Sequence, residues 1–514
     1  MSNRGHSSER DVTIADGSIA VLSPLDGSRL LRIPDQTGAV PDVVGRLRAA
    51  QPAWTSLDVG ARAQWVCRLR DWVLDNDAQL ARTIANESGK PVAEARVEVA
   101  IAVENMSYYA ARAERFLAGA APAPHGPLTA LKRLRIDHRP YEVVGVITPW
   151  NFPLAQAVLD VIPALLAGAS VVVKPSEYTP MTVLELVRGW SGIGAPPVLE
   201  AVTGGGSAGE AIVAAVDYIQ FTGSTRTGRA VAVQAAARLV PFGLELGGKD
   251  PAIVLADAAL SYAAKGIAWG GLANAGQMCT SIERVYVHSA VYDEFVALLV
   301  DEVARLRPGR DYGPLTTPEQ LTIVQRHVDA AVAAGARVVI GGAPEGDTTG
   351  YAPTVLVDVN HDMAVVREET FGPVLPIMAF DTEDEAVASA NDTSYGLSAS
   401  VWTRDRRRGE RIASRLHAGA VDINDVQAHL LCFPLPMHGW GDSGIGGRNG
   451  GADGILKYCR PQAVTSPRVT VTPLNELLWF PYTPLKSNLI GYAVRLIDGG
   501  GWKRRIGLNG NSAR

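Results

Sequence analysis

From Val143 onward, short runs of β-branched residues alternate with longer helical segments, and this alternation constrains the fold more than any other feature. The sequence reads VVGVI, then LAQAVLDVIPALLAG, then SVVVKP. Buried apolar strands separated by helical segments are typical of βαβ units, in which the strands run parallel. A second series with the same alternation begins after about Asp250. We therefore predict an α/β chain with two domains, each built around a largely parallel sheet.

The segment before Val143 has a different texture. From about Val44 to Leu117, apolar residues such as Trp65 and Leu69 recur at helical spacing, which predicts several amphipathic helices. Residues 128 to 141 instead alternate apolar and charged side chains, as a half-exposed strand or hairpin does. This second segment is a candidate oligomerisation arm.

Composition excludes several classes of protein. The 514 residues carry a formal net charge of −5 without a dominant basic block, so nucleic-acid binding has no evident electrostatic source. The four cysteines lie far apart without C-x-x-C spacing, which indicates a reducing cytoplasm, no zinc or other metal site, and at most one reactive thiol. No window reaches about 18 uninterrupted apolar residues, and the polar start of the chain lacks a secretory pattern. We expect a cytoplasmic protein.

Three polar residues stand where chemistry could use them. Cys279 lies between a glycine-containing segment and a β-branched run, although a lone cysteine is more often a small buried apolar residue. Glu245 is followed by Leu-Gly-Gly, where a desolvated carboxylate can act as a base, although a solvated acid at a strand end is commoner. Asn151 is bracketed by Pro149 and Pro153, so its amide direction is fixed, as an oxyanion site needs; a plain turn is the alternative.

Two further segments suggest a phosphate-containing cofactor. In FTGSTRTG, Gly223 and Gly228 flank a Ser/Thr-rich loop whose free N–H groups could face a pyrophosphate, although no G-x-G-x-x-G fingerprint is present. Lys174 and Glu177 follow a predicted strand end, where doubly wound sheets commonly meet the riboses of a dinucleotide. A charged turn is the simpler interpretation of that pair.

Six motifs together identify a family. They are PWNFP at 149–153, KPSE at 174–177, FTGSTRTG at 221–228, LELGG at 244–248, GQMC at 276–279 and EETFGP at 368–373. In this order they resemble the NAD(P)-dependent aldehyde dehydrogenase superfamily, from about residue 20 to 465. The resemblance implies a Rossmann-type cofactor domain, an α/β catalytic domain and a β oligomerisation arm. The implied boundaries are 13–125 with 142–248 for the cofactor domain, 126–141 with 460–475 for the arm, 249–459 for the catalytic domain, and 476–514 for a C-terminal extension.

The resemblance also implies a role for each motif residue. Cys279 would be the nucleophile, Glu245 the general base and Asn151 the oxyanion donor, and the aldehyde would be oxidised to an acid through a thiohemiacetal and a thioester on Cys279. NAD is the expected cofactor, because the Glu177 carboxylate would repel a 2′-phosphate, although Lys174 would favour NADP. The cofactor contacts implied are Trp150, Lys174, Glu177, Gly223, Ser224, Glu369 and Phe371.

The substrate follows from departures within the family. Succinate-semialdehyde enzymes of the family usually have an arginine on the helix after PWNFP, which binds the distal carboxylate of the substrate. Here that turn, Gln156 to Asp160, has no arginine. The expected tunnel residues are mostly apolar, which favours an aromatic or medium-chain aldehyde: Leu159, Met278, Thr280, Leu431 and Met437. Two alternatives stay open. One is a succinate-semialdehyde dehydrogenase, the label of a similar actinobacterial subgroup; the other, from a different class, is a catalytically silent structural or binding member.

The C-terminal extension exceeds the usual family end. It combines Trp479, Phe480 and Tyr482 with a helical pattern and the basic run 503–505. Three interpretations compete: a packed extension over the substrate mouth or a neighbouring subunit, an interfacial membrane contact, or a loose tail. The segment is too short and interrupted to span a bilayer. As partners we expect a small-molecule aldehyde and, in a homodimer or homotetramer, further copies of the chain.

Overall fold

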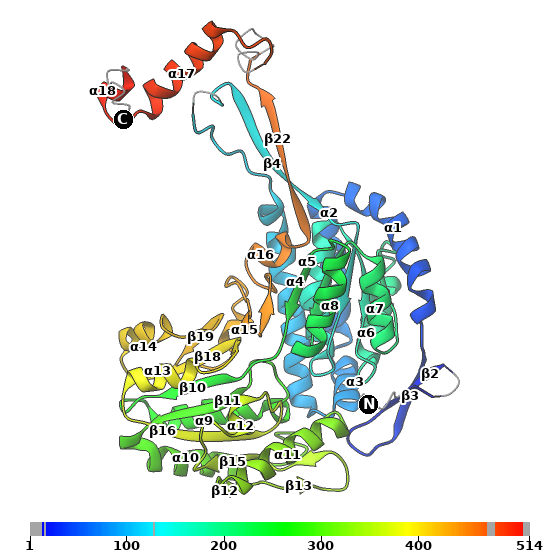
Figure 1. The fold of residues 1–514 in the computed structure, drawn as a ribbon. Coiled ribbons are helices and arrows are strands. Elements are labelled where there is room, and N and C mark those ends of the chain that lie inside the picture. Colours follow the sequence, from blue (N-terminus) through cyan, green and yellow to red (C-terminus); the bar gives the residue numbers. More distant parts are fainter. Residues whose placement is uncertain (1–12, 15–16, 127–128, 470–478, 507–514) are drawn as a thin grey trace, which may run out of the picture. The chain divides into compact units, whose positions relative to one another are not determined.

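The computed structural model describes residues 13–14, 17–126, 129–469 and 479–506, and these fall into two units (Figure 1). The larger unit comprises the chain up to Phe116 together with Pro140–Tyr458. The smaller unit comprises Leu117–Arg139 and Cys459–Arg514. Parallel strands with helices between them dominate the larger unit, so the predicted α/β fold class is confirmed.

A six-stranded sheet forms the first half of the larger unit, in the order β21-β9-β8-β5-β6-β7. Its strands are parallel except for β21, which returns from late in the chain and pairs antiparallel with β9. β5 and β6 are buried along their whole length, because helices cover both faces of the sheet. The strand bounds are β5 Val143–Ile147, β6 Ser170–Lys174, β7 Leu199–Ala201, β8 Tyr218–Thr222, β9 Phe242–Glu245 and β21 Gly444–Ile445.

The covering helices divide into two groups. α1, α7 and α8 pack over one apolar face of this sheet, and α2, α5 and α6 contact one another as a second group. Alternating buried residues such as Ile219 and Phe221 supply the sheet side of the first contact. The helix bounds are α1 Val40–Ser56, α2 Val59–Asp75, α5 Pro153–Ala167, α6 Met181–Gly192, α7 Gly206–Ala215 and α8 Thr225–Ala237.

A seven-stranded sheet forms the second half, in the order β12-β15-β16-β11-β10-β18-β19. All neighbouring pairs are parallel except β12 with β15. α9 and α10 supply one apolar layer, and α11, α13 and α14 supply the other. The bounds are β10 Asp250–Val254, β11 Ile282–His288, β12 Arg337–Ile340, β15 Thr354–Val357, β16 Val374–Phe380, β18 Ser398–Trp402, β19 Ala420–Ile423, α9 Leu260–Leu272, α10 Tyr292–Ala304, α11 Pro318–Ala333, α13 Glu383–Asn391 and α14 Arg406–Ala413.

The start of α6 corrects a local prediction. The Thr-Pro pair at 179–180 predicts a helix capped by the threonine, but Pro180 is the cap residue and the Thr179 hydroxyl donates to the Trp150 carbonyl at 3.1 Å. The first N–H groups of α6, from Met181 and Thr182, instead donate to the carboxylate of Glu87. Glu87 lies on α3 (Asp77–Ser88), so a distant side chain replaces the local cap.

The smaller unit has its own architecture. β4 (Lys132–Pro140) pairs with β22 (Cys459–Pro467), so the predicted strand lies within 128–141 and its partner comes from the far end of the chain. After residues 470–478, which lie outside the described part, come α17 (Pro484–Asp498) and the single-turn α18 (Trp502–Arg505). Among the described residues, no helix is long and apolar enough to cross a bilayer.

Candidate functional site

Cys279 lies in a tightly held loop between the short 3₁₀ helix Ala273–Gly276 and β11. Asn274, Ala275 and Gly276 adopt consecutive left-handed conformations, with φ of 51°, 54° and 72°. A Cβ on Gly276 would lie 2.1 Å from the Gly372 carbonyl oxygen, so only glycine fits. Such conformations persist only where the surroundings impose them. Here the Asn274 N–H donates to Glu94 Oε1 at 2.9 Å, and Gln277 Nε2 donates to the Asn274 carbonyl at 2.9 Å.

A buried ion pair fixes the loop that carries Asn151. Lys90 Nζ lies 2.7 Å from Glu98 Oε2, with both side chains inaccessible to solvent, and also donates to the Asn151 carbonyl at 2.8 Å. The other oxygen of Glu98 accepts from Leu154 N at 2.7 Å and so caps α5. Glu98 belongs to α4 (Val92–Leu117), so the helices before the first sheet set the position of this loop.

The Asn151 side chain points toward the cysteine loop. Its Nδ2 donates to the Gln277 carbonyl at 3.0 Å, two residues before Cys279. An amide nitrogen has two hydrogens, so one stays available for an oxygen bound beside Cys279. The Asn151 Oδ1 atom is buried without a hydrogen-bond partner in the described structure.

Glu245 ends β9 and lies beside the Cys279 thiol, with Arg448 on its other side. Burial raises the pKa of Glu245, while the Arg448 guanidinium and the Cys279 thiol lower it. Burial and the nearby carboxylate raise the pKa of Cys279 well above the usual value of a thiol. The resting thiol is therefore protonated, and Glu245 is placed to take its proton.

Arg448 connects Glu245 to a buried polar group on α5. Its guanidinium donates to Glu245 Oε2 and Gln156 Oε1, and it lies 3.7 Å from Asp160 Oδ2. Lys457 Nζ contacts the other oxygen of Asp160 at 3.1 Å, and burial lowers the pKa of this lysine to about 8. A buried charge needs such partners, because desolvation would otherwise favour its neutral form.

One cavity at Cys279, which we call the polar cavity, has a volume of about 780 Å³ including its open part. Asn151, Glu245 and Cys279 all line it, so the structure brings the three predicted catalytic residues together. Asn151 Oδ1, Glu245 Oε1 and the hydroxyl of Thr222, another lining residue, are buried without hydrogen-bond partners in the described structure. A polar ligand that supplies partners would satisfy these atoms.

Five of the seven predicted cofactor residues line the polar cavity: Trp150, Gly223, Ser224, Glu369 and Phe371. Ser224 also caps α8 by accepting from Thr227 N, so the N-terminal end of this helix, which favours negative charge, lies at the cavity wall. Lys174 and Glu177 do not line it. They lie at and beyond the end of β6, where Lys174 is buried and donates to the Pro175 carbonyl at 3.0 Å and to Glu177 Oε2 at 3.5 Å.

A second buried ion pair shapes the wall that carries Glu369 and Phe371. Lys249 Nζ pairs with Glu283, whose carboxylate also accepts from the N–H groups of Thr370 at 2.7 Å and Phe371 at 2.8 Å. Glu369 Oε1 accepts from Gly248 N at 3.0 Å, and burial raises the pKa of Glu369 to about 8. The wall is thus positioned from β10 and β11, in the second sheet.

A second cavity, which we call the apolar cavity, reaches Cys279 from another side and has a volume of about 990 Å³ including its open part. All five predicted tunnel residues line it: Leu159, Met278, Thr280, Leu431 and Met437. Phe152 and Ile101 add to the apolar wall, and Gln156 and Arg448 lie at the end near the sulfur. Val97, Trp269 and Leu431 also line this cavity while staying about half exposed, at 53%, 52% and 49%.

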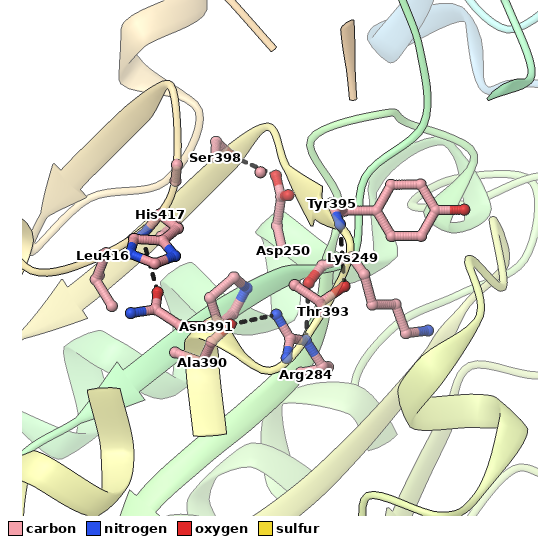
Figure 2. A pocket seen from close by; sticks show the side chains of 14 residues that line it. Lys249, Asp250, Arg284, Ala390, Asn391, Thr393, Tyr395, Ser398, Leu416 and His417 are labelled. Carbon is pink, nitrogen blue, oxygen red and sulfur yellow. Dashed lines mark hydrogen bonds between the residues drawn. The ribbon is translucent and has the colours of Figure 1, made fainter. Parts of the chain in front are cut away.

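Figure 2 shows a third, smaller cavity around Asp250 and Arg284. The Ser398 hydroxyl donates to Asp250, and Arg284 donates to the carbonyls of Ala390 at 2.8 Å and Lys249 at 2.8 Å (Figure 2). These bonds connect β10 to β18 and β11 to α13, so Asp250 and Arg284 join neighbouring elements of the second sheet. Across the described ranges, no cluster of three His, Cys, Asp or Glu side chains is arranged to hold a metal ion.

Sequence reasoning missed the residues that hold the site together. Arg448, Lys90 and Glu283 contact partners far away along the chain, and no local pattern marks them. The available signal for Arg448 is weak: it is a lone arginine in the glycine-rich stretch SGIGGRNGG.

Comparison with known proteins gives one consistent result. The sequence model described as the aldehyde dehydrogenase family matches residues 12–464. A protein of Mycolicibacterium smegmatis, provisionally named as an NADP(+) succinate-semialdehyde dehydrogenase, is 42% identical over 459 residues, covering 86% of this chain and 87% of that protein. The 4,4'-diapolycopene aldehyde oxidase of a Methylomonas species is 38% identical over 474 residues, covering 91% of this chain and 88% of that protein. The crystal structure of an NAD-dependent aldehyde dehydrogenase from Sinorhizobium meliloti superposes with a TM-score of 0.85 at 35% identity, covering 91% of this chain and 94% of that one.

Proposed function

Because the chain belongs to the aldehyde dehydrogenase family, we propose that it oxidises an apolar aldehyde, aromatic or of medium length, to the carboxylic acid with NAD(P)⁺. The observation that carries this proposal is the position of Cys279 between two cavities. The polar cavity also holds Glu245 and Asn151, and the apolar cavity leads from Cys279 to exposed apolar residues. A dinucleotide and an apolar aldehyde can thus reach the same sulfur from different sides.

The chemistry proceeds by covalent capture on Cys279. Glu245 takes the thiol proton, and the thiolate attacks the carbonyl carbon to give a thiohemiacetal. The free hydrogen of the Asn151 amide and the Cys279 N–H stabilise the oxyanion; one such donor is typically worth about 10²–10³ in rate. The chemistry that NAD(P)⁺ supplies when bound is acceptance of the hydride that leaves the thiohemiacetal carbon. Glu245 releases the thiol proton to solvent and then takes a proton from a water molecule. The resulting hydroxide attacks the thioester carbon, the C–S bond breaks to release the acid, and the sulfur recovers a proton.

Trp150, Gly223, Ser224, Glu369 and Phe371 would hold the cofactor in the polar cavity. We infer a preference for NAD⁺, because the Glu177 carboxylate beyond β6 would repel a 2′-phosphate. Lys174 gives NADP⁺ little help, because its ammonium group is buried and already shared between Pro175 and Glu177.

A second candidate substrate is succinate semialdehyde, which the name of the M. smegmatis relative suggests. A cationic side chain in the apolar cavity would favour this substrate by binding its carboxylate. That side chain is Arg448, but Glu245, Gln156 and Asp160 already surround its guanidinium. A substrate carboxylate would have to displace the catalytic base. We therefore favour the apolar aldehyde.

The test is a panel of aldehydes with each cofactor, read by NADH or NADPH absorbance. Benzaldehydes and saturated aldehydes up to dodecanal should give kcat/KM at least about tenfold above that of succinate semialdehyde, because burying their apolar surface in the apolar cavity favours binding. A preference for succinate semialdehyde would reverse the substrate assignment, and no turnover of any aldehyde would refute the proposed function.

A further inference from the structure

The helix α17 has a continuous row of exposed apolar side chains along one side, while Val494 and Ile497 are exposed elsewhere on it. Leu485, Leu489, Tyr492 and Leu496 follow one another at spacings of four, three and four residues, which places them on one side of a helix. Their exposed fractions are 70%, 50%, 63% and 62%. We call these four residues the apolar face of α17. Ser487 and Asp498 lie on the opposite side.

Large aromatic residues lie at both ends of this helix. Trp479, Phe480 and Tyr482 precede it and are 62%, 81% and 67% exposed, and Trp502 follows it at 65%. Tryptophan and tyrosine favour the boundary between water and the acyl chains of a lipid bilayer, because each combines an apolar ring with a polar atom. Exposed apolar residues in this number and arrangement mark an interaction surface.

The charge of this segment indicates which kind of surface it would bind. Residues 484–506 contain the five basic residues Lys486, Arg495, Lys503, Arg504 and Arg505 and the single acidic residue Asp498, although the whole chain has a net charge of −5. Two copies of this segment packed against each other would bring like charges together. An anionic lipid surface instead attracts the basic residues while accepting the apolar face.

From these observations we propose that residues 479–506 bind the surface of anionic lipid bilayers, with the apolar face of α17 buried at the boundary between headgroups and acyl chains and the basic residues paired with lipid phosphates. Thr483 caps the helix by accepting from Lys486 N, so the helix has a defined start. The helix lies along the interface and does not cross it, since it spans only Pro484–Asp498. These residues lie beyond the segment 12–464 that matches the family. The proposal is therefore independent of the catalytic chemistry.

The experiment measures binding of the full chain to vesicles by co-sedimentation. Vesicles of phosphatidylcholine with about one third phosphatidylglycerol should bind the chain at least about tenfold more tightly than phosphatidylcholine alone. Raising NaCl from about 0.1 M to about 0.5 M should weaken binding severalfold, because salt screens the basic residues.

Two matched substitutions on the same helix separate the apolar face from general charge effects. Leu489→Glu should weaken binding at least about tenfold, because it places a carboxylate among the acyl chains. Ser487→Glu adds the same charge on the opposite side and should change binding by no more than about threefold. The double substitution Arg504→Glu with Arg505→Glu should remove most of the preference for anionic vesicles. Turnover of a water-soluble aldehyde should be unchanged in all three variants, which shows that they fold.

Three results would overturn the proposal. The first is failure of the unmodified chain to bind anionic vesicles. The second is equal binding by the Leu489→Glu and Ser487→Glu variants. The third is a change in sedimentation or melting temperature caused by Leu489→Glu without vesicles, since that would assign the apolar face to a second copy or to the chain's own body.

Discussion

The polar cavity and the apolar cavity share Cys279 and Gln156 but differ in how their walls are held. Backbone N–H groups, glycines and buried carboxylates line the polar cavity, and their positions depend on ion pairs and hydrogen bonds. Leucine, methionine and aromatic side chains make up most of the apolar cavity wall, and these side chains offer little or no hydrogen bonding to hold them. Hydrogen-bonding groups stabilise a reacting atom only when they are accurately placed, whereas an apolar wall tolerates substitution by apolar side chains of similar volume. Substitutions on the two sides should therefore fail in different ways.

The largest effect is expected where the two cavities meet. Cys279→Ala should lower turnover by at least about a thousandfold, because no other group can form the thioester. Cofactor binding, followed by quenching of tryptophan fluorescence, should persist, since the sulfur only borders the polar cavity. Cys432→Ala, at an exposed cysteine, is the control and should keep full activity. Substantial turnover by the Cys279 variant would contradict covalent catalysis.

On the polar side, Glu245→Gln should lower the steady-state rate by about a hundredfold. Rapid mixing with excess aldehyde should still show a first turnover of NADH. Losing Glu245 slows formation of the thiolate, but we expect it to slow the hydrolysis that follows hydride transfer more. If the first turnover slows as much as the steady-state rate, the role of Glu245 is limited to forming the thiolate and does not extend to thioester hydrolysis.

Arg448→Gln tests how accurately the base is held. Arg448 lowers the pKa of Glu245 against the effect of burial, so its loss should raise that pKa. Glu245 acts in its deprotonated form, and the rate rises with pH through its pKa; the rising limb should therefore move to higher pH. We expect kcat near neutral pH to fall about tenfold, with partial recovery in Arg448→Lys. An unshifted pH profile would limit Arg448 to a structural role.

On the apolar side, Leu159→Arg should act through substrate binding. A guanidinium in the apolar cavity should lower kcat/KM for decanal about tenfold and spare propanal, which needs less of the wall. Leu74→Arg, at an exposed position on α2, is the matched control. Equal losses for both aldehydes would indicate that the cavity had collapsed.

The last effect is expected far from Cys279, beyond the end of β6, and concerns the choice of cofactor. Glu177→Gln should shift the ratio of kcat/KM values for NADP⁺ and NAD⁺ about tenfold toward NADP⁺, because one negative charge is lost near the expected ribose. The matched substitution Glu200→Gln, on β7, should leave the ratio unchanged. A ratio that does not move would place the ribose elsewhere.

How well the sequence predicts this molecule depends on how far apart the interacting residues lie. β5 and β6 form at the runs VVGVI and SVVVK, because a β-branched run between helices is a local signal. All five predicted tunnel residues line one cavity. Leu159, Met278 and Thr280 were predictable because they lie within or shortly after the motifs PWNFP and GQMC. No such local signal in the sequence predicts the strand β21 or the ion pairs Lys90–Glu98 and Arg448–Glu245. They form only when distant segments pack together, as does the Glu87 cap that displaced Thr179.

The apolar wall of the second cavity also affects the end of the catalytic cycle. The aldehyde enters uncharged, but the acid formed at Cys279 is an anion at neutral pH. A carboxylate surrounded by Phe152, Leu159 and Met437 lacks the hydration it has in water, and the nearby Arg448 is already paired with Glu245. The wall that attracts the substrate therefore expels the product, so accumulating acid should compete only weakly with fresh aldehyde.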